Sequence, residues 1–234
     1  MSATRTRTHT FSPLTAGGHP LSLTPGPLSL GRYSTDYVFD GGATGLPKGP
    51  YGEADAPAPL NVYGSSKLAG ETSVLAADPS ALVIRTNVVF GPETAGKNFV
   101  YQLARKLKAG EAMNVPTDQV NTPTYSRDLA EASVLLVEKE ASGIFNVGGS
   151  DPLDRLAFGC MVVGELSGLN WHSLDASHLK GVTTSNSGQA AKRPLASGLR
   201  LDKTLALLPS WRPRSVGAAL KNWKENPRGK PLGE

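Results

Sequence analysis

The sequence predicts an α/β fold in which parallel strands alternate with helices. Residues 82–86 form a continuous apolar and β-branched run, which is typical of a strand buried on both faces of a parallel sheet. We expect residues 87–92 to continue this strand and to end it in a turn. Residues 143–149 indicate another strand and a tight turn, because two glycines end the run just before a helix-start signal at 150–152. Residues 99–108 and 128–138 place apolar side chains at helical spacing.

Composition narrows the class of protein further. The chain of 234 residues is long enough for one domain with a substantial core, and its formal charge of +4 is scattered, so nucleic acid is not an expected partner. Cys160 is the single cysteine, which excludes an internal disulfide, and the four histidines lack ligand spacing, which predicts no metal site. No apolar run reaches membrane-spanning length, so we expect a cytoplasmic protein and no membrane partner.

Hydroxyl groups stand near the first expected strand. Ser34 and Thr35 lie beside the run Tyr37-Val38-Phe39, which indicates a short strand end. Because the carboxyl ends of strands in open α/β sheets are where ligands meet reactive groups, we expect these hydroxyls at a site.

Tyr63 and Lys67 lie four residues apart in a segment that we expect to be helical. At this spacing the two side chains share one helix face. A positive charge stabilises a neighbouring phenolate, so a Tyr–Lys pair can donate a proton near neutral pH. Alone, this spacing favours an ordinary exposed pair. Together with Thr35 it indicates a proton-donating site for a carbonyl oxygen.

The run Ser-Thr-Asp-Tyr-Val-Phe-Asp-Gly at 34–41 and the pattern Pro-Tyr-x-Glu-x-Asp at 50–55 are long and specific. A third pattern, Leu-Asn-x-Tyr-Gly-x-x-Lys-x-x-Gly-Glu, follows at 60–71. Together they resemble the dTDP-4-dehydrorhamnose reductase family of extended short-chain dehydrogenases/reductases, which includes the regulatory β subunit of methionine adenosyltransferase. The resemblance covers about residues 33–223.

The resemblance implies the C-terminal part of a doubly wound, Rossmann-like parallel sheet with a small substrate-binding lobe. It implies NADP or NAD as cofactor and a nucleotide-sugar as substrate, whose 4-keto group is reduced. Thr35, Tyr63 and Lys67 would be catalytic, with Lys67 making the phenol a stronger acid and holding the ribose. Four residues would contact substrate: Asp36, Tyr37, Val88 and Arg193. Tyr63, Lys67 and Asn87 would contact the cofactor.

One substitution departs from the family. Val88 stands where rhamnose-pathway enzymes have a tryptophan that stacks on the substrate, and the regulatory branch also tends to lack that aromatic residue. Arg193 belongs to an Arg-Pro motif whose other interpretation is a surface turn. The partners implied are therefore the nucleotide-sugar and either a homodimer or a synthetase subunit.

The cofactor-binding half of the family is not recognisable in the sequence. We expect residues 1–32 to be a disordered or non-homologous segment. The segment bears arginine and lacks acidic residues, which also fits an organelle transit peptide, but that interpretation is less favoured. Residues 33–225 would form the partial Rossmann, reductase-like domain, and 226–234 a disordered tail. No glycine-rich turn follows a strand and opens a helix, which is what pyrophosphate binding requires.

Two further segments invite functional interpretations that we reject. Residues 91–98 approach the phosphate-binding pattern G-x-x-x-x-G-K-[ST], but Asn98 replaces the metal-binding hydroxyl, so a turn before a helix is favoured. Cys160 lies in an expected helix at 156–166, where we interpret its thiol as buried core. Trp211 and Trp223 are expected to pack around a terminal helix.

The sequence leaves three functions open. The first is the reductase, with activity dependent on a cofactor site that this sequence does not show. The second is a non-catalytic regulatory subunit that docks on a synthetase. The third is a truncated product without a function of its own.

Overall fold

The computed structural model describes residues 31–43, 48–166 and 175–227 of the chain. The predictions for residues 1–30 and 228–234 fall outside these ranges. The first described strand begins at Gly31, two positions before the predicted start of the reductase-like domain.

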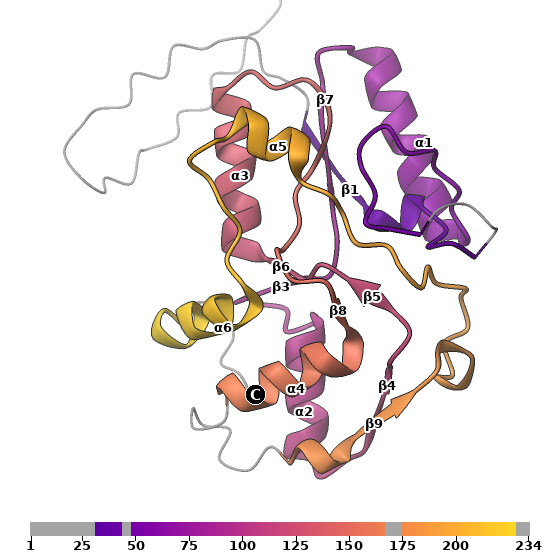
Figure 1. The fold of residues 1–234 in the computed structure, drawn as a ribbon, viewed down its shortest axis with the longest axis vertical. Coiled ribbons are helices and arrows are strands. Elements are labelled where there is room, and N and C mark those ends of the chain that lie inside the picture. The colour runs from indigo at the N-terminus through magenta and orange to yellow at the C-terminus, as the bar shows by residue number, and fades with distance from the viewer. Residues whose placement is uncertain (1–30, 44–47, 167–174, 228–234) are drawn as a thin grey trace, which may run out of the picture.

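A parallel sheet forms the upper half of the molecule in Figure 1. Its strands are β1 (Gly31–Thr35), β2 (Leu82–Thr86) and β7 (Gly143–Asn146), in the order β1-β2-β7. All five residues of β2 are buried, as expected for the central strand. Thr35 pairs with Thr86 and Arg85 with Asn146, so the three strands end at one edge.

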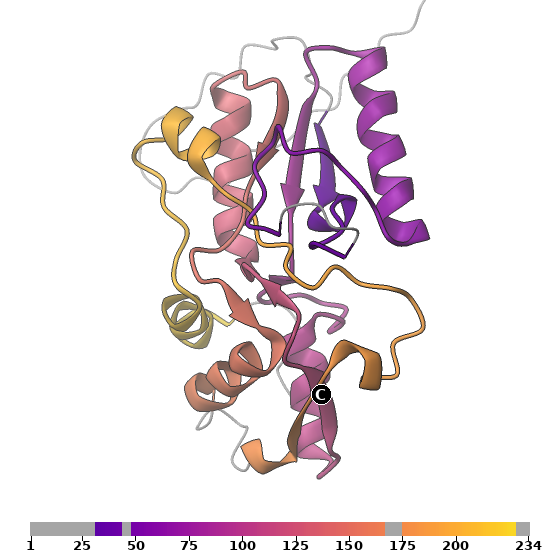
Figure 2. The same cartoon turned by 45° about the vertical axis from the view of Figure 1, so that its right-hand side comes forward.

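Helices cover both faces of this sheet, with α1 on one side and α3 and α5 on the other (Figures 1 and 2). Their bounds are α1 Val62–Ala77, α3 Ser126–Glu138 and α5 Asp202–Leu207. Ile84 and Phe145 pack with Leu129, Leu136 and Trp211 in one core cluster. Coverage of both faces by helices is the doubly wound arrangement that the sequence predicts.

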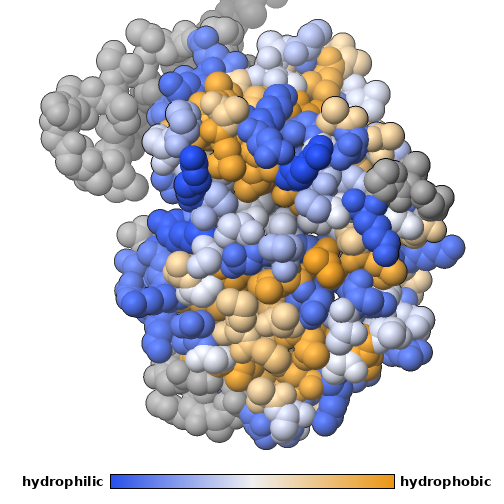
Figure 3. Space-filling view, in the orientation of Figure 1, coloured by the Kyte–Doolittle hydropathy of each residue, from blue (hydrophilic) through white to orange (hydrophobic). Residues whose placement is uncertain are grey.

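A smaller lobe packs below the sheet (Figure 1). It contains α2 (Phe99–Lys108), α4 (Arg155–Leu166), α6 (Val216–Glu225) and the parallel pair β4 (Met113–Pro116) and β9 (Leu179–Val182). Leu103, Phe158, Val162 and Trp223 belong to its core. Apolar residues appear in both halves of the face in Figure 3. The predicted helix 99–108 is confirmed, and Asn98 caps it by accepting from two backbone N–H groups.

Short elements join the two halves. β3 (Val89–Phe90) pairs with β6 (Thr124–Tyr125), and β5 (Val120–Asn121) pairs with β8 (Leu153–Asp154). Three 3-10 turns complete the description: η1 (Asp36–Val38), η2 (Ala176–His178) and η3 (Thr184–Asn186).

Three local predictions are wrong. The segment Tyr37-Val38-Phe39 is not a strand end, because the Thr35 side chain accepts from the backbone N–H of Tyr37 and caps the turn η1. Strand 82–86 does not continue through Val88, whose φ of 40° breaks the extended backbone. Cys160 is exposed, because α4 buries the face containing Phe158, Val162 and Leu166 instead.

Trp211 and Trp223 are both buried, which confirms their packing role, although only Trp223 lies within a helix. Among the described residues, no helix is long and apolar enough to cross a membrane. Likewise, His, Cys, Asp and Glu side chains do not gather into a metal-binding group of three or more within the described ranges.

Candidate functional site

A cavity of about 640 Å³ opens where β1 ends. It is lined by six of the residues predicted from the sequence, namely Thr35, Asp36, Tyr37, Tyr63, Val88 and Arg193. These residues come from the end of β1, the start of α1, the turn after β2 and the segment before residue 196. The fold therefore gathers distant segments at the carboxyl edge of the parallel sheet, where open α/β folds bind ligands.

Helix α1 begins at this cavity because Asn61 caps it. The side chain of Asn61 accepts from the backbone N–H of Gly64 at 2.8 Å and donates to the carbonyl of Lys192 at 2.8 Å. A Cβ at Gly64 would lie 2.1 Å from the carbonyl oxygen of Tyr37. Glycine is thus required here for the close approach of helix and turn, which places Tyr63 beside Tyr37.

Tyr63 stands at the cavity with 52% of its surface exposed. Its ring meets the ring of Tyr37 edge to face, with centroids 5.7 Å apart. The Nζ of Lys67 lies 5.7 Å from the Tyr63 ring centroid, so the predicted pairing on one helix face is confirmed. Lys67 itself donates to the backbone carbonyl of Tyr33 at 3.3 Å and does not line the cavity.

Arg193 and Arg155 bring positive charge to the site. Nη1 of Arg193 donates to the hydroxyl of Tyr37 at 2.5 Å, and Arg193 Nε is buried without a described hydrogen-bond partner. Arg155 begins α4 and stacks its guanidinium over Phe99, 5.4 Å from the ring centroid. Burial lowers the pKa of Arg155, while Tyr37 and Asp36 oppose that shift.

Both arginines also line a second cavity of about 310 Å³ that lies between α2, β4 and Gln189. Val88 is shared by the two cavities as well. An elongated ligand could therefore extend from Tyr63 past the two guanidinium groups. Guanidinium groups bind phosphate well, because their N–H donors match its oxygens in pairs.

Asp36 is buried and its carboxylate is fully engaged. Oδ1 accepts from Thr35 Oγ1 at 3.1 Å, and Oδ2 accepts from Ser197 Oγ at 2.6 Å and from Asn121 Nδ2 at 3.2 Å. Burial raises the pKa of Asp36 to about 6, against the opposing effects of Ser197, Thr35 and Arg155. Asp36 thus lies at the edge of the cavity with both carboxylate oxygens hydrogen-bonded to protein side chains.

Asn87, which the resemblance assigned to the cofactor, lies elsewhere. Its amide is buried and exchanges hydrogen bonds with Thr122 and Thr124. It does not line the cavity of Tyr63, whereas its neighbour Val88 does. Its contact with a cofactor stays a prediction.

Sequence reasoning missed Arg155, Asn121 and Ser197. Asn121 and Ser197 are 85 and 161 positions from Asp36, and no periodicity links such residues. Arg155 follows a recognisable helix-start signal, but only tertiary packing turns the first residue of α4 toward the cavity.

Several signature residues support the scaffold and do not line the cavity. Arg85 and Glu71 form a buried bidentate salt bridge, with Nη2–Oε2 at 2.7 Å and Nε–Oε1 at 3.0 Å. The ring of Tyr51 stacks on Phe39 with centroids 4.2 Å apart. Oε1 of Glu53 accepts from the backbone N–H of Asn146 at 2.9 Å. These contacts tie α1 and the loop before it to the sheet.

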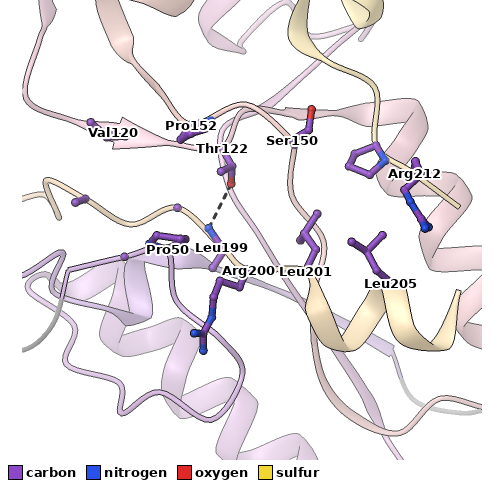
Figure 4. A pocket seen from close by; sticks show the side chains of 15 residues that line it. Pro50, Val120, Thr122, Ser150, Pro152, Leu199, Arg200, Leu201, Leu205 and Arg212 are labelled. Atoms are coloured by element: carbon purple, nitrogen blue, oxygen red, sulfur yellow. Dashed lines mark hydrogen bonds between the residues drawn. The ribbon is translucent and has the colours of Figure 1, made fainter. Parts of the chain in front are cut away.

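A third cavity, of about 520 Å³, lies between the 196–201 segment and α5 (Figure 4). Its lining is mostly apolar, including Pro50, Leu199 and Leu205, and the Thr122 hydroxyl accepts from the backbone N–H of Leu199 at 3.3 Å. Arg200 and Arg212 also line it, but no acid, His, Cys or Tyr is among its described lining residues, so it offers no side chain suited to exchange a proton near neutral pH.

The rejected phosphate-loop pattern at 91–98 is also explained. Oε1 of Glu93 accepts from the backbone N–H groups of Lys97 and Asn98 at 2.5 and 2.6 Å. These are the donors that a phosphate would use, and the Glu93 carboxylate of the same loop already occupies them.

The chain is similar in sequence to several known proteins. A dTDP-4-dehydrorhamnose reductase of Sinorhizobium fredii is 32% identical over 207 residues, covering 83% of this chain and 62% of that protein. The methionine adenosyltransferase 2 subunit beta of Danio rerio is 34% identical over 168 residues, covering 69% of this chain and 49% of that protein. This chain therefore spans less than two thirds of these relatives.

A solved structure of dTDP-4-dehydrorhamnose reductase from Bacillus anthracis, in complex with NADP, has a TM-score of 0.72 and 28% identity. It covers 84% of this chain, which in turn covers 65% of it. The model of the RmlD substrate binding domain matches residues 28–224. With most of its length matched by that model, the chain belongs to the RmlD substrate-binding domain family, the family of the dTDP-4-dehydrorhamnose reductases.

Proposed function

We propose that this chain binds a dTDP-linked 4-keto sugar and supplies the proton for reduction of its keto group. The observation that carries the proposal is the pair of cavities at the carboxyl edge of the sheet that share Val88, Arg155 and Arg193 as lining residues. The larger cavity is also lined by the threonine Thr35 and the phenol of Tyr63. In a keto sugar joined to a nucleoside diphosphate, the keto oxygen can accept a hydrogen bond from a hydroxyl or phenol, and the diphosphate can accept from guanidinium groups.

Each residue would act through its own chemistry. Thr35 would donate a hydrogen bond to the keto oxygen, and Tyr63 would transfer its phenolic proton to that oxygen as it becomes a hydroxyl. Lys67, stacked near Tyr63, would stabilise the phenolate left behind. Arg193 and Arg155 would hold the diphosphate. General acid catalysis of this kind contributes roughly 10²–10⁴-fold to a rate.

The described residues fit a nicotinamide cofactor only at its reactive end. In this proposal Thr35 and Tyr63 meet the nicotinamide ring and the sugar, but the glycines that follow β3 and β7, Gly91 and Gly149, offer no open cradle for pyrophosphate. A Cβ at Gly149 would lie 2.0 Å from the carbonyl oxygen of Pro123, and one at Gly91 would lie 2.1 Å from Ser126 Oγ. When bound, NADP or NAD would supply the hydride, held mainly by groups outside those described here.

A second candidate function is regulatory. The relative from Danio rerio is named as a subunit of methionine adenosyltransferase, and Val88 supplies no aromatic ring to the cavity. In that case the chain would keep the cavity and dock on a synthetase without turnover. A homodimer stays a further prediction.

The test is oxidation of NADPH or NADH by the parent chain on addition of dTDP-4-dehydrorhamnose. Tyr63→Phe should lower turnover by roughly 10²-fold or more, while binding of the product dTDP-rhamnose persists. Tyr33→Phe is the matched control, because Tyr33 is equally exposed but donates to Ser133 and does not line the cavity. Sugar-nucleotide binding without turnover in the parent would favour the regulatory function, and absence of both would refute the proposal.

A further inference from the structure

The extended segments around residues 120–121 and 196–197 lie side by side and present apolar side chains to one face and polar side chains to the other. Val120 and Ala196 pair in a parallel bridge, and both line the apolar cavity of Figure 4. The next residue in each segment, Asn121 and Ser197, contacts Asp36 on the other face. This alternation follows from extended backbone, in which successive side chains point to opposite faces.

We propose that Asp36 is a positioning residue, held by Asn121 and Ser197, whose protonation decides whether the Thr35 hydroxyl donates to Asp36 or to a ligand oxygen. The inference rests on the proposed function insofar as that oxygen is the keto oxygen of a sugar. It differs from the expectation that Asp36 contacts substrate itself.

The hydrogen-bond inventory determines the two states. The Thr35 hydroxyl has one proton, which it donates to Oδ1 of a charged Asp36 at 3.1 Å. Oδ2 already accepts from Ser197 and Asn121, and Asn121 also donates to Ser197 Oγ at 2.8 Å, which orients that pair. A proton added to Asp36 is therefore accommodated at Oδ1, facing Thr35.

Protonated Asp36 reverses the contact. Its Oδ1–H donates to Thr35 Oγ1, which also accepts from the backbone N–H of Tyr37 at 3.3 Å. Both acceptor positions of the hydroxyl are then used, and its own proton is free to point into the cavity. Thr35 becomes a donor to ligand only in this state.

Physiological pH can move this equilibrium, because burial raises the pKa of Asp36 to about 6. The charged and titratable groups that line the cavity with it are Arg155 of α4, Lys192 and Arg193 of the following segment, Tyr63 of α1 and its neighbour Tyr37. The three cations favour the charged carboxylate, while burial opposes it. The Thr35 hydroxyl is thus free below a pH of about 6 and engaged above it.

The first test is a ¹³C NMR titration of the Asp36 carboxyl in the full chain, which requires no turnover. Thr35→Val removes both the donor to charged Asp36 and the acceptor of protonated Asp36. Because the hydrogen bond to the charged form is the stronger one, the pKa of Asp36 should rise, by roughly tenfold in the protonation constant. Ser34→Ala is the control, because the Ser34 hydroxyl is buried on the same strand without a described partner. Equal titrations in both variants and the parent would overturn the proposal.

The second test uses Asp36→Asn. With Oδ2 accepting from Ser197 and Asn121, the amide NH₂ must face Thr35 and imitate the protonated acid permanently. Binding or turnover of dTDP-4-dehydrorhamnose by Asp36→Asn should then no longer change with pH over the range in which Asp36 titrates in the unsubstituted chain. A titration step that persists in Asp36→Asn would contradict the inference. If the parent has no turnover, the proposed function fails, while the NMR titration still decides the role of Asp36.

Discussion

The guanidinium of Arg193 donates a 2.5 Å hydrogen bond to the hydroxyl of Tyr37, a residue 156 positions earlier in the chain. The same guanidinium lies over the Tyr37 ring, 5.7 Å from its centroid. This contact fastens the segment before Ala196 to the turn after β1. It also holds a positive charge at the boundary between two cavities, where we place the diphosphate of the ligand.

Replacing Arg193 should therefore weaken binding of dTDP. Arg193→Lys keeps the charge but loses the planar fork, and a hydrogen bond to a charged group contributes about 1.5–3 kcal/mol. We expect Kd to rise roughly 10–100-fold in calorimetry. Arg212→Lys, at the cavity of Figure 4, should leave Kd unchanged. Equal effects of the two substitutions would place dTDP elsewhere.

Gly64 should be intolerant of alanine. Its Cβ would lie 2.1 Å from the carbonyl oxygen of Tyr37, so α1 must move away from the site. We expect a loss of about 1–3 kcal/mol of unfolding free energy, as for other overpacked sites. In contrast, a Cβ at Gly164 of α4 meets nothing within 4 Å, and Gly164→Ala should stabilise by about 0.5–1 kcal/mol. Urea unfolding of both variants checks the opposite signs.

Breaking the buried salt bridge between Glu71 of α1 and Arg85 should lower the free energy of unfolding substantially. Glu71→Gln leaves the guanidinium buried without its counter-charge, and breaking such a pair costs roughly 3–5 kcal/mol. Glu165→Gln, at an exposed position of α4, should change stability by less than about 0.5 kcal/mol. A Glu71→Gln variant as stable as Glu165→Gln in guanidinium unfolding would show that the pair contributes little.

Stability should depend on pH through Asp36. Folding raises its pKa from 3.8 to about 6, so the folded chain binds more protons between these values. Its contribution is therefore fully present below the lower pKa and is lost as pH rises through about 6. The difference corresponds to roughly 3 kcal/mol.

Asp36→Asn removes this titration. Its stability relative to the parent should therefore increase from acid to neutral pH, and thermal unfolding across that range measures the difference. A constant difference would mean that Asp36 titrates alike in the folded and unfolded chain.

Sequence patterns predict structure well where the pattern lies within a single helix or strand. Strand β2 and helix α2 are found at the predicted residues, because a run of apolar and β-branched residues and a helical repeat of apolar residues both indicate burial. The pairing of Tyr63 with Lys67 follows from helix geometry alone. The fold class and family were also predictable, since the signature at 50–71 carries scaffold contacts such as Glu71 with Arg85.

Contacts between distant segments were not predictable. The position of Arg155 and the engagement of Asp36 by Ser197 depend on how the lobe packs against the sheet. The turn at Tyr37 depends on one side-chain cap by Thr35, which outweighs the β-propensity of Tyr-Val-Phe. Cys160 was misassigned because a helix of largely apolar residues leaves its buried face ambiguous.

The most direct test of the central claim is a crystal structure of the chain with dTDP-rhamnose. The account predicts the 4-hydroxyl of the sugar within hydrogen-bonding distance of Tyr63 and Thr35, and the diphosphate beside Arg193 and Arg155. A sugar nucleotide bound instead in the apolar cavity of Pro50 and Leu205, or a folded chain that binds none, would contradict it.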